Sequence, residues 1–248
     1  MRTIAFINQK GGVGKTTSTV NIGAGLAKLK KRVLLIDLDP QAHLTYSMGI
    51  QGHEAEHTVY DLLRGDAKAE QVIMDKYGMK IIPATLDLSG AEMEFSGIAG
   101  REFLLREALD GINEFDYILL DCPPSLGLLT LNGLTTANEV FIPLQAEFLA
   151  LQGLTKLLET VEVVKKRLNK KLDITGVIGT RFDQRKKLNK EVISKVQEHF
   201  GDKVFKTMIR ENIALAEAPS FGQTIFEYQA NSYGAEDYLA LSKEITKQ

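Results

Sequence analysis

The stretch RTIAFINQKGGVGKTTSTVNIGAGLAKLKK, residues 2–31, decides the fold of this chain. It begins with an apolar, β-branched run at 2–8, passes through a glycine-rich turn and ends in a helical pattern at 16–31. A strand that runs through such a turn directly into a helix N-terminus is an arrangement that binds phosphate groups. The stretch therefore predicts a strand–helix unit with a nucleotide site at its centre.

The glycines of the turn allow a tight backbone path, so that successive N–H groups point inward at phosphate oxygens. Lys15 should reach the β- and γ-phosphates of ATP, the Thr16 hydroxyl should ligate Mg²⁺, and Thr17 should contact the α-phosphate. The pattern G-x-x-x-x-G-K-[ST] requires glycine where this chain has Gln9, so the loop is a deviant form. The residues expected to bind the nucleotide form one segment: Gly11, Gly12, Val13, Gly14, Lys15, Thr16 and Thr17.

Two further apolar runs end in acidic residues. VLLIDLDPQ contains Asp37 and Asp39, and YILLDCPPS contains Asp121. Acids at the carboxyl ends of parallel strands meet at the sheet edge where open α/β sheets bind ligands. We expect Asp121 to hold Mg²⁺ through water, Asp37 to lie near the metal, and Asp39 to orient the attacking water.

Strand and helix patterns alternate along the rest of the chain, which predicts one α/β domain over 1–248 with a doubly wound, mainly parallel sheet of the P-loop type. Residues 40–78 are the least regular, and we expect them to wrap the edge of the site. The other expected strands are 32–39, 79–84, 116–121, 139–144, 173–180 and 203–209. The expected helices are 16–31, 101–112, 153–168 and 188–200.

Composition narrows the class of protein. The single cysteine excludes a disulfide framework and fits a reducing compartment. No apolar run reaches the roughly 18 residues of a membrane span, and the N-terminal residues do not read as a signal peptide, so a cytoplasmic protein is expected.

The formal net charge of −2 conceals a basic band at 160–210, which has fourteen basic and six acidic side chains. Such a band indicates a polyanion partner or a pair of lysine-rich solvated helices.

Five segments in order resemble the ParA/Soj family of chromosome- and plasmid-partition ATPases, which have deviant Walker A loops. The resemblance covers nearly the whole chain and rests on KGGVGKTT (10–17), DLDPQ (37–41), LLDCPPSLGLLTLNGL (119–134), PLQAEFLALQGL (143–154) and LAEAPSFGQTI (215–225).

The resemblance implies an ATPase that dimerises face to face on binding Mg-ATP. It implies that Lys10 crosses to the partner subunit's nucleotide, that Thr16 and Asp121 hold Mg²⁺, and that Asp39 supports hydrolysis. A lysine supplied by an arriving subunit resembles an arginine finger in trans. The resemblance also implies that the dimer binds DNA without sequence preference, in association with the nucleoid, and that a ParB-type partner stimulates hydrolysis.

Part of the basic band matches the family's DNA-binding region. The residues expected to bind DNA are Arg185, Lys186, Lys187 and Lys190 from that region, together with Lys206. The family commonly carries an additional arginine in a segment that here contains Glu211 and Ala214, and this departure puts the second DNA contact in question. The adenine contacts are expected after the strands at 173–180 and 203–209, from Arg181, Phe182 and Arg210.

Other branches of the superfamily remain alternatives. A MinD-like or cargo-positioning ATPase would act on a membrane or protein cluster, but the tail GAEDYLALSKEITKQ is net acidic and favours a packing helix over a lipid-binding one. A metabolic ATPase of this fold also stays open. One cysteine argues against the iron-protein branch, which holds its cluster with two per subunit. A non-hydrolysing scaffold would lack Asp39 or Asp121, and both are present.

Overall fold

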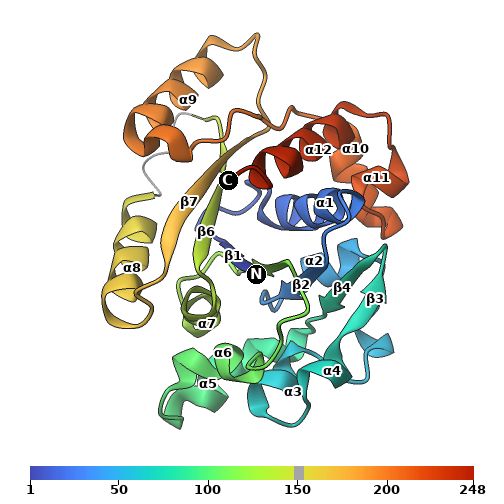
Figure 1. Ribbon diagram of the computed structural model, residues 1–248, viewed down its shortest axis with the longest axis vertical. Helices are drawn as coiled ribbons and strands as arrows, with labels where there is room; N and C mark the ends of the chain where they lie inside the picture. The colour runs from blue at the N-terminus through green and yellow to red at the C-terminus, as the bar shows by residue number, and fades with distance from the viewer. Residues whose placement is uncertain (148–153) are drawn as a thin grey trace.

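The fold is built on one seven-stranded sheet, seen in a computed structural model that describes residues 1–147 and 154–248 (Figure 1). The strand order is β3-β4-β2-β5-β1-β6-β7, and every pairing is parallel except that of β3 with β4. The strands are β1 Arg2–Phe6, β2 Val33–Asp37, β3 Met74–Lys76, β4 Met79–Ile82, β5 Tyr117–Asp121, β6 Glu139–Gln145 and β7 Asp173–Thr180.

Helices connect the strands. The α-helices are α1 Lys15–Lys28, α2 His43–Ser47, α3 Val59–Arg64, α4 Ala69–Val72, α5 Ala91–Glu94, α6 Leu104–Ala108, α7 Leu128–Thr136, α8 Leu154–Arg167, α9 Lys187–Phe200, α10 Ile213–Glu217, α11 Ile225–Tyr228 and α12 Tyr233–Ile245. The 3₁₀-helices are η1 Gly52–Glu54, η2 Leu86–Gly90, η3 Phe95–Gly97, η4 Arg101–Phe103, η5 Gly201–Lys203 and η6 Ala218–Phe221.

The central strands are buried on both faces, and alternate residues feed two separate cores. On β2, Leu35 joins a core with α1 and α12, whereas Leu34 joins a core with α3, α6, α7 and α8. The two groups of helices accordingly lie on opposite sides of the sheet (Figure 1). Apolar side chains at every position of a strand require such double cover. The predicted doubly wound, mainly parallel sheet is confirmed.

Strand register brings the predicted acids together. Asp121 at the end of β5 pairs with Asp37 of β2 on one side and with Phe6 of β1 on the other. The glycine-rich loop follows β1, so both carboxylates lie at the same sheet edge as that loop. This placement follows from parallel pairing, because the carboxyl ends of all three strands lie level.

Two secondary-structure predictions were wrong, and one strand was not predicted. Residues 203–209 form no strand. They run beside β7 and are held there by an isolated bridge and by backbone hydrogen bonds, among them Phe205 N–H to Val177 O and Ile209 N–H to Gly179 O. The expected helix at 101–112 is reduced to η4 and α6. The short β3 was missed, since it exists only as a hairpin partner of β4 across a turn in which Tyr77 and Gly78 both have positive φ.

The C-terminal helix α12 is a packing element, as predicted. Tyr238, Leu241 and Ile245 are buried in the core that also contains α1. The two helices lie close together at Gly25 of α1, where an added Cβ would lie 2.2 Å from the Oγ of Ser242. Among the described residues, no helix combines the length and apolar character needed to cross a bilayer.

The close approach of α1 and α12 predicts that Gly25→Ala destabilises the chain by about 1–3 kcal/mol through overpacking. This loss should appear although alanine favours a helix interior by about 1 kcal/mol over glycine. Urea unfolding of the parent, Gly25→Ala, Ser242→Ala and the double variant measures it. Ser242→Ala removes the clashing oxygen. The free energy of unfolding should therefore fall less when Gly25→Ala is added to Ser242→Ala than when it is added to the parent. A Gly25→Ala variant as stable as the parent would contradict this packing.

Candidate nucleotide site

The loop between β1 and α1 has the backbone conformation that phosphate binding requires. Gly12 and Gly14 have φ values of 73° and 88°, a region that L side chains rarely adopt. Gly14 is the N-cap of α1, and Lys15 is its first residue. The N-terminal end of α1, with its partial positive charge, therefore opens onto the loop.

Side chains from distant strands hold the loop in place. Asn8 donates from Nδ2 to the carbonyl of Pro143 at 2.8 Å and accepts from the backbone N–H of Lys10 at 3.0 Å. On the other side, the Thr180 hydroxyl donates to the carbonyl of Val13 at 2.8 Å. Sequence analysis did not identify these residues. Thr180 could have been found as a polar residue closing a strand, by the rule that found Asp121.

Asp121 is the polar centre of the site. Its Oδ2 accepts from the Thr16 hydroxyl at 2.6 Å, and its Oδ1 from the Thr19 hydroxyl at 3.3 Å. Burial, followed by the charge of Asp37, raises the pKa of Asp121 to about 8. Burial also lowers the pKa of Lys15, against the opposing charges of Asp121 and Asp39.

Asp37 and Asp39 are placed differently. Asp37 is buried and accepts from the backbone N–H and hydroxyl of Thr45 at 2.9 and 2.8 Å, and from the backbone N–H of Asp39 at 3.1 Å. Burial raises its pKa to about 6. These bonds tie β2 to α2, and a metal role for Asp37 stays a prediction. Asp39 accepts from the backbone N–H of Gln41 at 3.0 Å and lines the cavity beside the loop.

The charge balance of the site suits a divalent cation. In the described residues the site gathers three buried carboxyl groups, Asp37, Asp39 and Asp121, and one buried ammonium, that of Lys15. No group of three or more His, Cys, Asp or Glu side chains in the described part of the chain could hold a metal alone. Mg²⁺ in nucleotide sites needs only one or two protein ligands besides phosphates and waters, so Thr16 and Asp121 fit it.

Two cavities flank the glycine loop. One of about 660 Å³, here called the phosphate cavity, is lined by Gly11, Gly12, Gly14, Lys15, Thr16, Thr17, Asp39, Gln41, His43, Tyr46, Ser47, Pro124, Pro219 and Ser220. The other, of about 440 Å³, is called the base cavity and is lined by Gly12, Val13, Gly14, Thr17, Thr180, Arg181, Ile209, Arg210, Glu211, Asn212, Ile213, Leu215, Ala216 and Tyr238. Gly12, Gly14 and Thr17 border both, so the two cavities form neighbouring halves of one site.

The base cavity contains two of the three residues expected to contact adenine. Arg181 and Arg210 line it, whereas Phe182 is not among its lining residues. The Arg210 guanidinium is bound to Asp237 and Glu236, at 2.6 and 2.7 Å, and lies over the ring of Tyr233. The apolar lining from Ile213 and Leu215 was not predicted, since isolated apolar residues in a short helix carry no signal of ligand contact.

Lys10 differs from Lys15 in its surroundings. Lys15 is only 8% exposed, whereas the Lys10 side chain is 44% exposed. Its Nζ lies 2.5 Å from the Oε2 of Glu147, just beyond β6. The family-like segment at 143–154 continues into residues 148–153, which lie outside the described residues. Of the two lysines, Lys10 is therefore the one presented to the surface.

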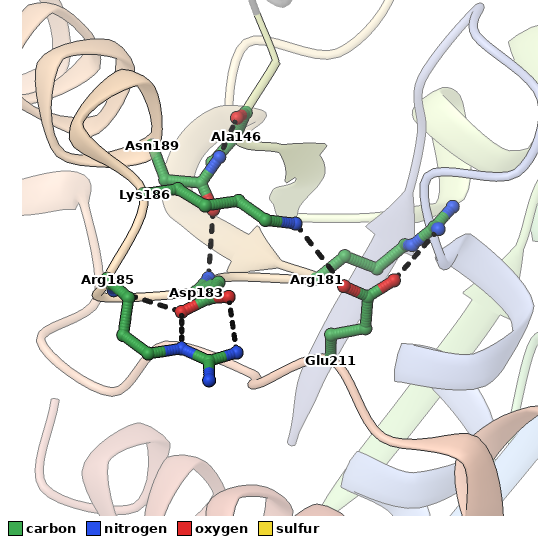
Figure 2. Close-up of polar contacts among 7 residues, drawn as sticks. All are labelled: Ala146, Arg181, Asp183, Arg185, Lys186, Asn189 and Glu211. Carbon is green, nitrogen blue, oxygen red and sulfur yellow. Dashed lines mark hydrogen bonds and ion pairs between the residues drawn. The ribbon is translucent and has the colours of Figure 1, made fainter.

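The predicted DNA-binding residues are all exposed and lie around the start of α9, with Lys206 in the segment beside β7. Arg185 is paired with Asp183 at 2.9 Å, and Lys186 with Glu211 at 3.6 Å (Figure 2). Lys187 lies 3.7 Å from Glu191. Within residues 1–147 and 154–248, the side-chain ammonium groups of Lys190 and Lys206 form no ion pair, although the backbone N–H of Lys206 donates to Glu244.

Comparisons with known proteins agree with this geometry. A family model described as an AAA domain matches residues 1–174. The sporulation initiation inhibitor protein Soj of Bacillus subtilis is 49% identical over 247 residues, covering 98% of each chain. The chromosome-partitioning ATPase Soj of Treponema pallidum is also 49% identical, covering 98% of this chain and 96% of that protein. The structure of cobyrinic acid a,c-diamide synthase from Mycobacterium smegmatis with ADP and magnesium has 37% identity and a TM-score of 0.87, covering 100% of this chain and 94% of that chain.

The parallel sheet, the glycine loop and the acids at the strand ends define a P-loop nucleotide-binding protein. Within this class the chain belongs to the ParA/Soj family of chromosome-partitioning ATPases. The predicted family is confirmed, and so is the predicted class of enzyme, an ATPase with ATP and Mg²⁺ as its cofactors.

The raised pKa of Asp121 predicts how stability depends on pH without nucleotide and Mg²⁺. An ordinary aspartate has a pKa of 3.8, so between pH 3.8 and about 8 the folded chain holds more protons than the unfolded chain. Stability therefore falls as pH rises through this window. In thermal unfolding with EDTA, the melting temperature of Asp121→Asn should depend less on pH than that of the parent. At pH 8 it should lie at least about 3 °C above the parental value.

The matched control for this prediction is Asp116→Asn. The guanidinium of Arg32 lowers the pKa of Asp116 to about 2, so neutralising this exposed carboxylate should give no gain at pH 8. An equal rise in melting temperature for both variants would show that the effect comes from net charge and not from burial of Asp121.

Proposed function

We propose that this chain is a partition ATPase whose Mg-ATP form is a sandwich dimer that binds DNA without sequence preference. The observation that carries the proposal is the contrast between the two lysines of the loop. Lys15 is buried beside Asp121 and serves the chain's own site, whereas Lys10 is exposed at the front of the loop and available to a second copy.

Within one subunit, the chain's own groups bind and orient the phosphates of ATP. The backbone N–H groups of the glycine loop and the N-terminus of α1 receive the phosphate oxygens. The Lys15 ammonium neutralises charge on the β- and γ-phosphates. Thr16 and Asp121 would hold Mg²⁺, which when bound neutralises charge that develops on the phosphate oxygens.

Asp39 is the group proposed to orient the attacking water. It lines the phosphate cavity, and a carboxylate oxygen there can accept a hydrogen bond from water and align it with the γ-phosphate. Asp37 is proposed to support Asp39 indirectly, since its Oδ1 accepts the Asp39 backbone N–H. Both bonds from Thr45 go to the Oδ2 of Asp37, so a direct metal contact of Asp37 would use its Oδ1.

Dimerisation is proposed to exchange one partner of Lys10 for another. In the single chain its ammonium binds Glu147. Exposed ion pairs of this kind are weak, of the order of 0–1 kcal/mol, so a phosphate group on a second subunit can displace the carboxylate. Because the nucleotide then forms part of the interface, the dimer depends on ATP.

The basic band is proposed to contact DNA phosphates through Arg185, Lys186, Lys187, Lys190 and Lys206, which would associate the dimer with the nucleoid. A ParB-type partner is proposed to stimulate hydrolysis and return the chain to a monomer, so that the cycle segregates a chromosome or plasmid.

The alternative is a MinD-like or cargo-positioning ATPase. The burial of the apolar stripe of α12 against α1 favours the DNA-binding proposal over one in which this helix binds lipid.

The role of Lys10 is tested by Lys10→Ala. This variant should still bind nucleotide, because Lys15 and the loop backbone are intact, but should lose the dimer that Mg-ATP forms in the parent. Light scattering of the parent and the variant with ATP, ADP and no nucleotide measures the change. Glu147→Gln is the control for loss of the intramolecular pair and should keep the dimer. A normal ATP dimer in Lys10→Ala would end the trans role.

The role of Asp39 is tested by Asp39→Ala. Hydrolysis should fall by about a hundredfold or more, since the water is no longer oriented, while the ATP dimer should persist longer than in the parent. Phosphate release and light scattering on the same samples separate the two effects. Turnover at the parental rate in Asp39→Ala would remove this residue from the mechanism.

DNA binding is tested by gel retardation with ATP, ADP and no nucleotide over a salt series. ATP-dependent binding should weaken steeply with salt and should not depend on sequence, because the contacts go to phosphates. Affinity that does not fall with salt would contradict the electrostatic surface. If ATP produces no DNA binding at all, the cargo-positioning alternative is favoured.

A further inference from the structure

Glu211 lies between the base cavity and the basic band. Its Oε1 accepts from the Arg181 guanidinium at 3.1 Å, and its Oε2 lies 3.6 Å from the Nζ of Lys186 (Figure 2). Arg181 and Glu211 line the base cavity, whereas Lys186 is the N-cap of α9 in the basic band. A single carboxylate therefore holds two cations of the basic band, one of which, Arg181, also lines the base cavity. We call these three residues the Glu211 clamp.

Backbone bonds set the positions of the clamp residues. Phe182 donates its N–H to the carbonyl of Ile209 at 2.9 Å, which fixes the segment after β7 against the segment that leads to Glu211. Asn189 accepts from the Asp183 N–H at 2.8 Å and donates to the carbonyl of Ala146 at 2.7 Å (Figure 2). The loop that carries Arg181 and Lys186 is therefore anchored at both ends, and Glu211 meets the two cations through the fold.

The clamp contributes little to folding, because all three side chains are half exposed, at 50–56%. Exposed ion pairs are weak and screened by salt. Glu211 matters more for the surface charge than for stability, because its carboxylate neutralises a surface at which two cations would otherwise face a polyanion. The other pairs at this end of the band are local, Arg185 with Asp183 and Lys187 with Glu191. Glu211 instead reaches the band from a segment 25 residues beyond Lys186.

We propose that Glu211 is a built-in competitor of the polyanion, which lowers the affinity of the chain for DNA by holding Arg181 and Lys186. The inference rests on the proposed DNA binding of the basic band. A phosphate that approaches either cation must displace a carboxylate and not a loosely held counterion. The gain from counterion release, which drives such binding, is then reduced at both positions.

The matched variants Glu211→Gln and Glu191→Gln test this competition. Each replaces one exposed carboxylate by an isosteric amide and changes the net charge equally, but Glu211 holds two cations and Glu191 holds one at 3.7 Å. Glu211→Gln should elute from a heparin column at clearly higher salt than either the parent or Glu191→Gln. With ATP, its affinity for DNA should rise at least about threefold, and the slope of log affinity against log salt should steepen by about 1–2.

The double variant Glu211→Gln/Lys186→Gln should lose much of the gain, since one of the two released cations is gone. Equal behaviour of Glu211→Gln and Glu191→Gln would overturn the proposal, because net charge alone would then explain both. Heparin elution of Glu211→Gln at the parental salt concentration would also overturn it.

The heparin and DNA measurements separate this inference from the proposed function. If the parent shows no ATP-dependent DNA binding but Glu211→Gln still elutes from heparin later than Glu191→Gln, the proposed function fails and the clamp stands. If the parent binds DNA with ATP and the two glutamine variants do not differ, the clamp fails and the proposed function stands.

Discussion

The nucleotide site depends on one constraint set by the sheet: the acidic side chains that close neighbouring strands are buried together at its carboxyl edge. Parallel register sets Asp121 beside Asp37, and Asp39 follows two residues later, while Lys15 supplies the one ammonium buried near them in the described residues. Such a cluster is costly unless hydrogen bonds, protons or bound cations offset it. Thr16, Thr19 and Thr45 supply the hydrogen bonds. The remaining imbalance has the sign that a bound divalent cation would offset.

The scaffold around this cluster is formed by buried, closely packed elements. Helix α1 starts at the loop and packs against α12 from Ser18 to Gly25, and the sheet beneath it is buried on both faces. By contrast, the groups proposed to meet a second subunit or a polyanion lie on exposed side chains, with Lys10 on the loop and Lys186 at the start of α9. The groups proposed to bind phosphate thus lie at the core layers, whereas those proposed to act in assembly form weak, exchangeable surface pairs.

The sequence predicted the features that local pattern determines. Buried strands appeared as continuous apolar runs, and the acids that close them appeared at their ends, so Asp121 and the glycine loop were located without tertiary information. The predictions failed where long-range pairing decides: β3 is three residues long and exists only beside β4, and the apolar segment 203–209 follows β7 without joining the sheet. The side-chain partners of Asp37, Lys10 and Glu211 include Thr45, Glu147 and Arg181, which lie 8, 137 and 30 residues away, and no spacing rule predicts these pairs.

The one cysteine of the chain lies in the middle of this architecture. Cys122 follows Asp121 directly and is fully buried, and burial raises the pKa of its thiol. Its sulfur lies against α7, where a Cβ at Gly133 would come within 2.7 Å of it. A thiol so placed reacts only when the layer between β5 and α7 opens. Cys122 is therefore a built-in probe of local opening: the rate at which a thiol reagent modifies it reports how often the centre of the sheet is exposed.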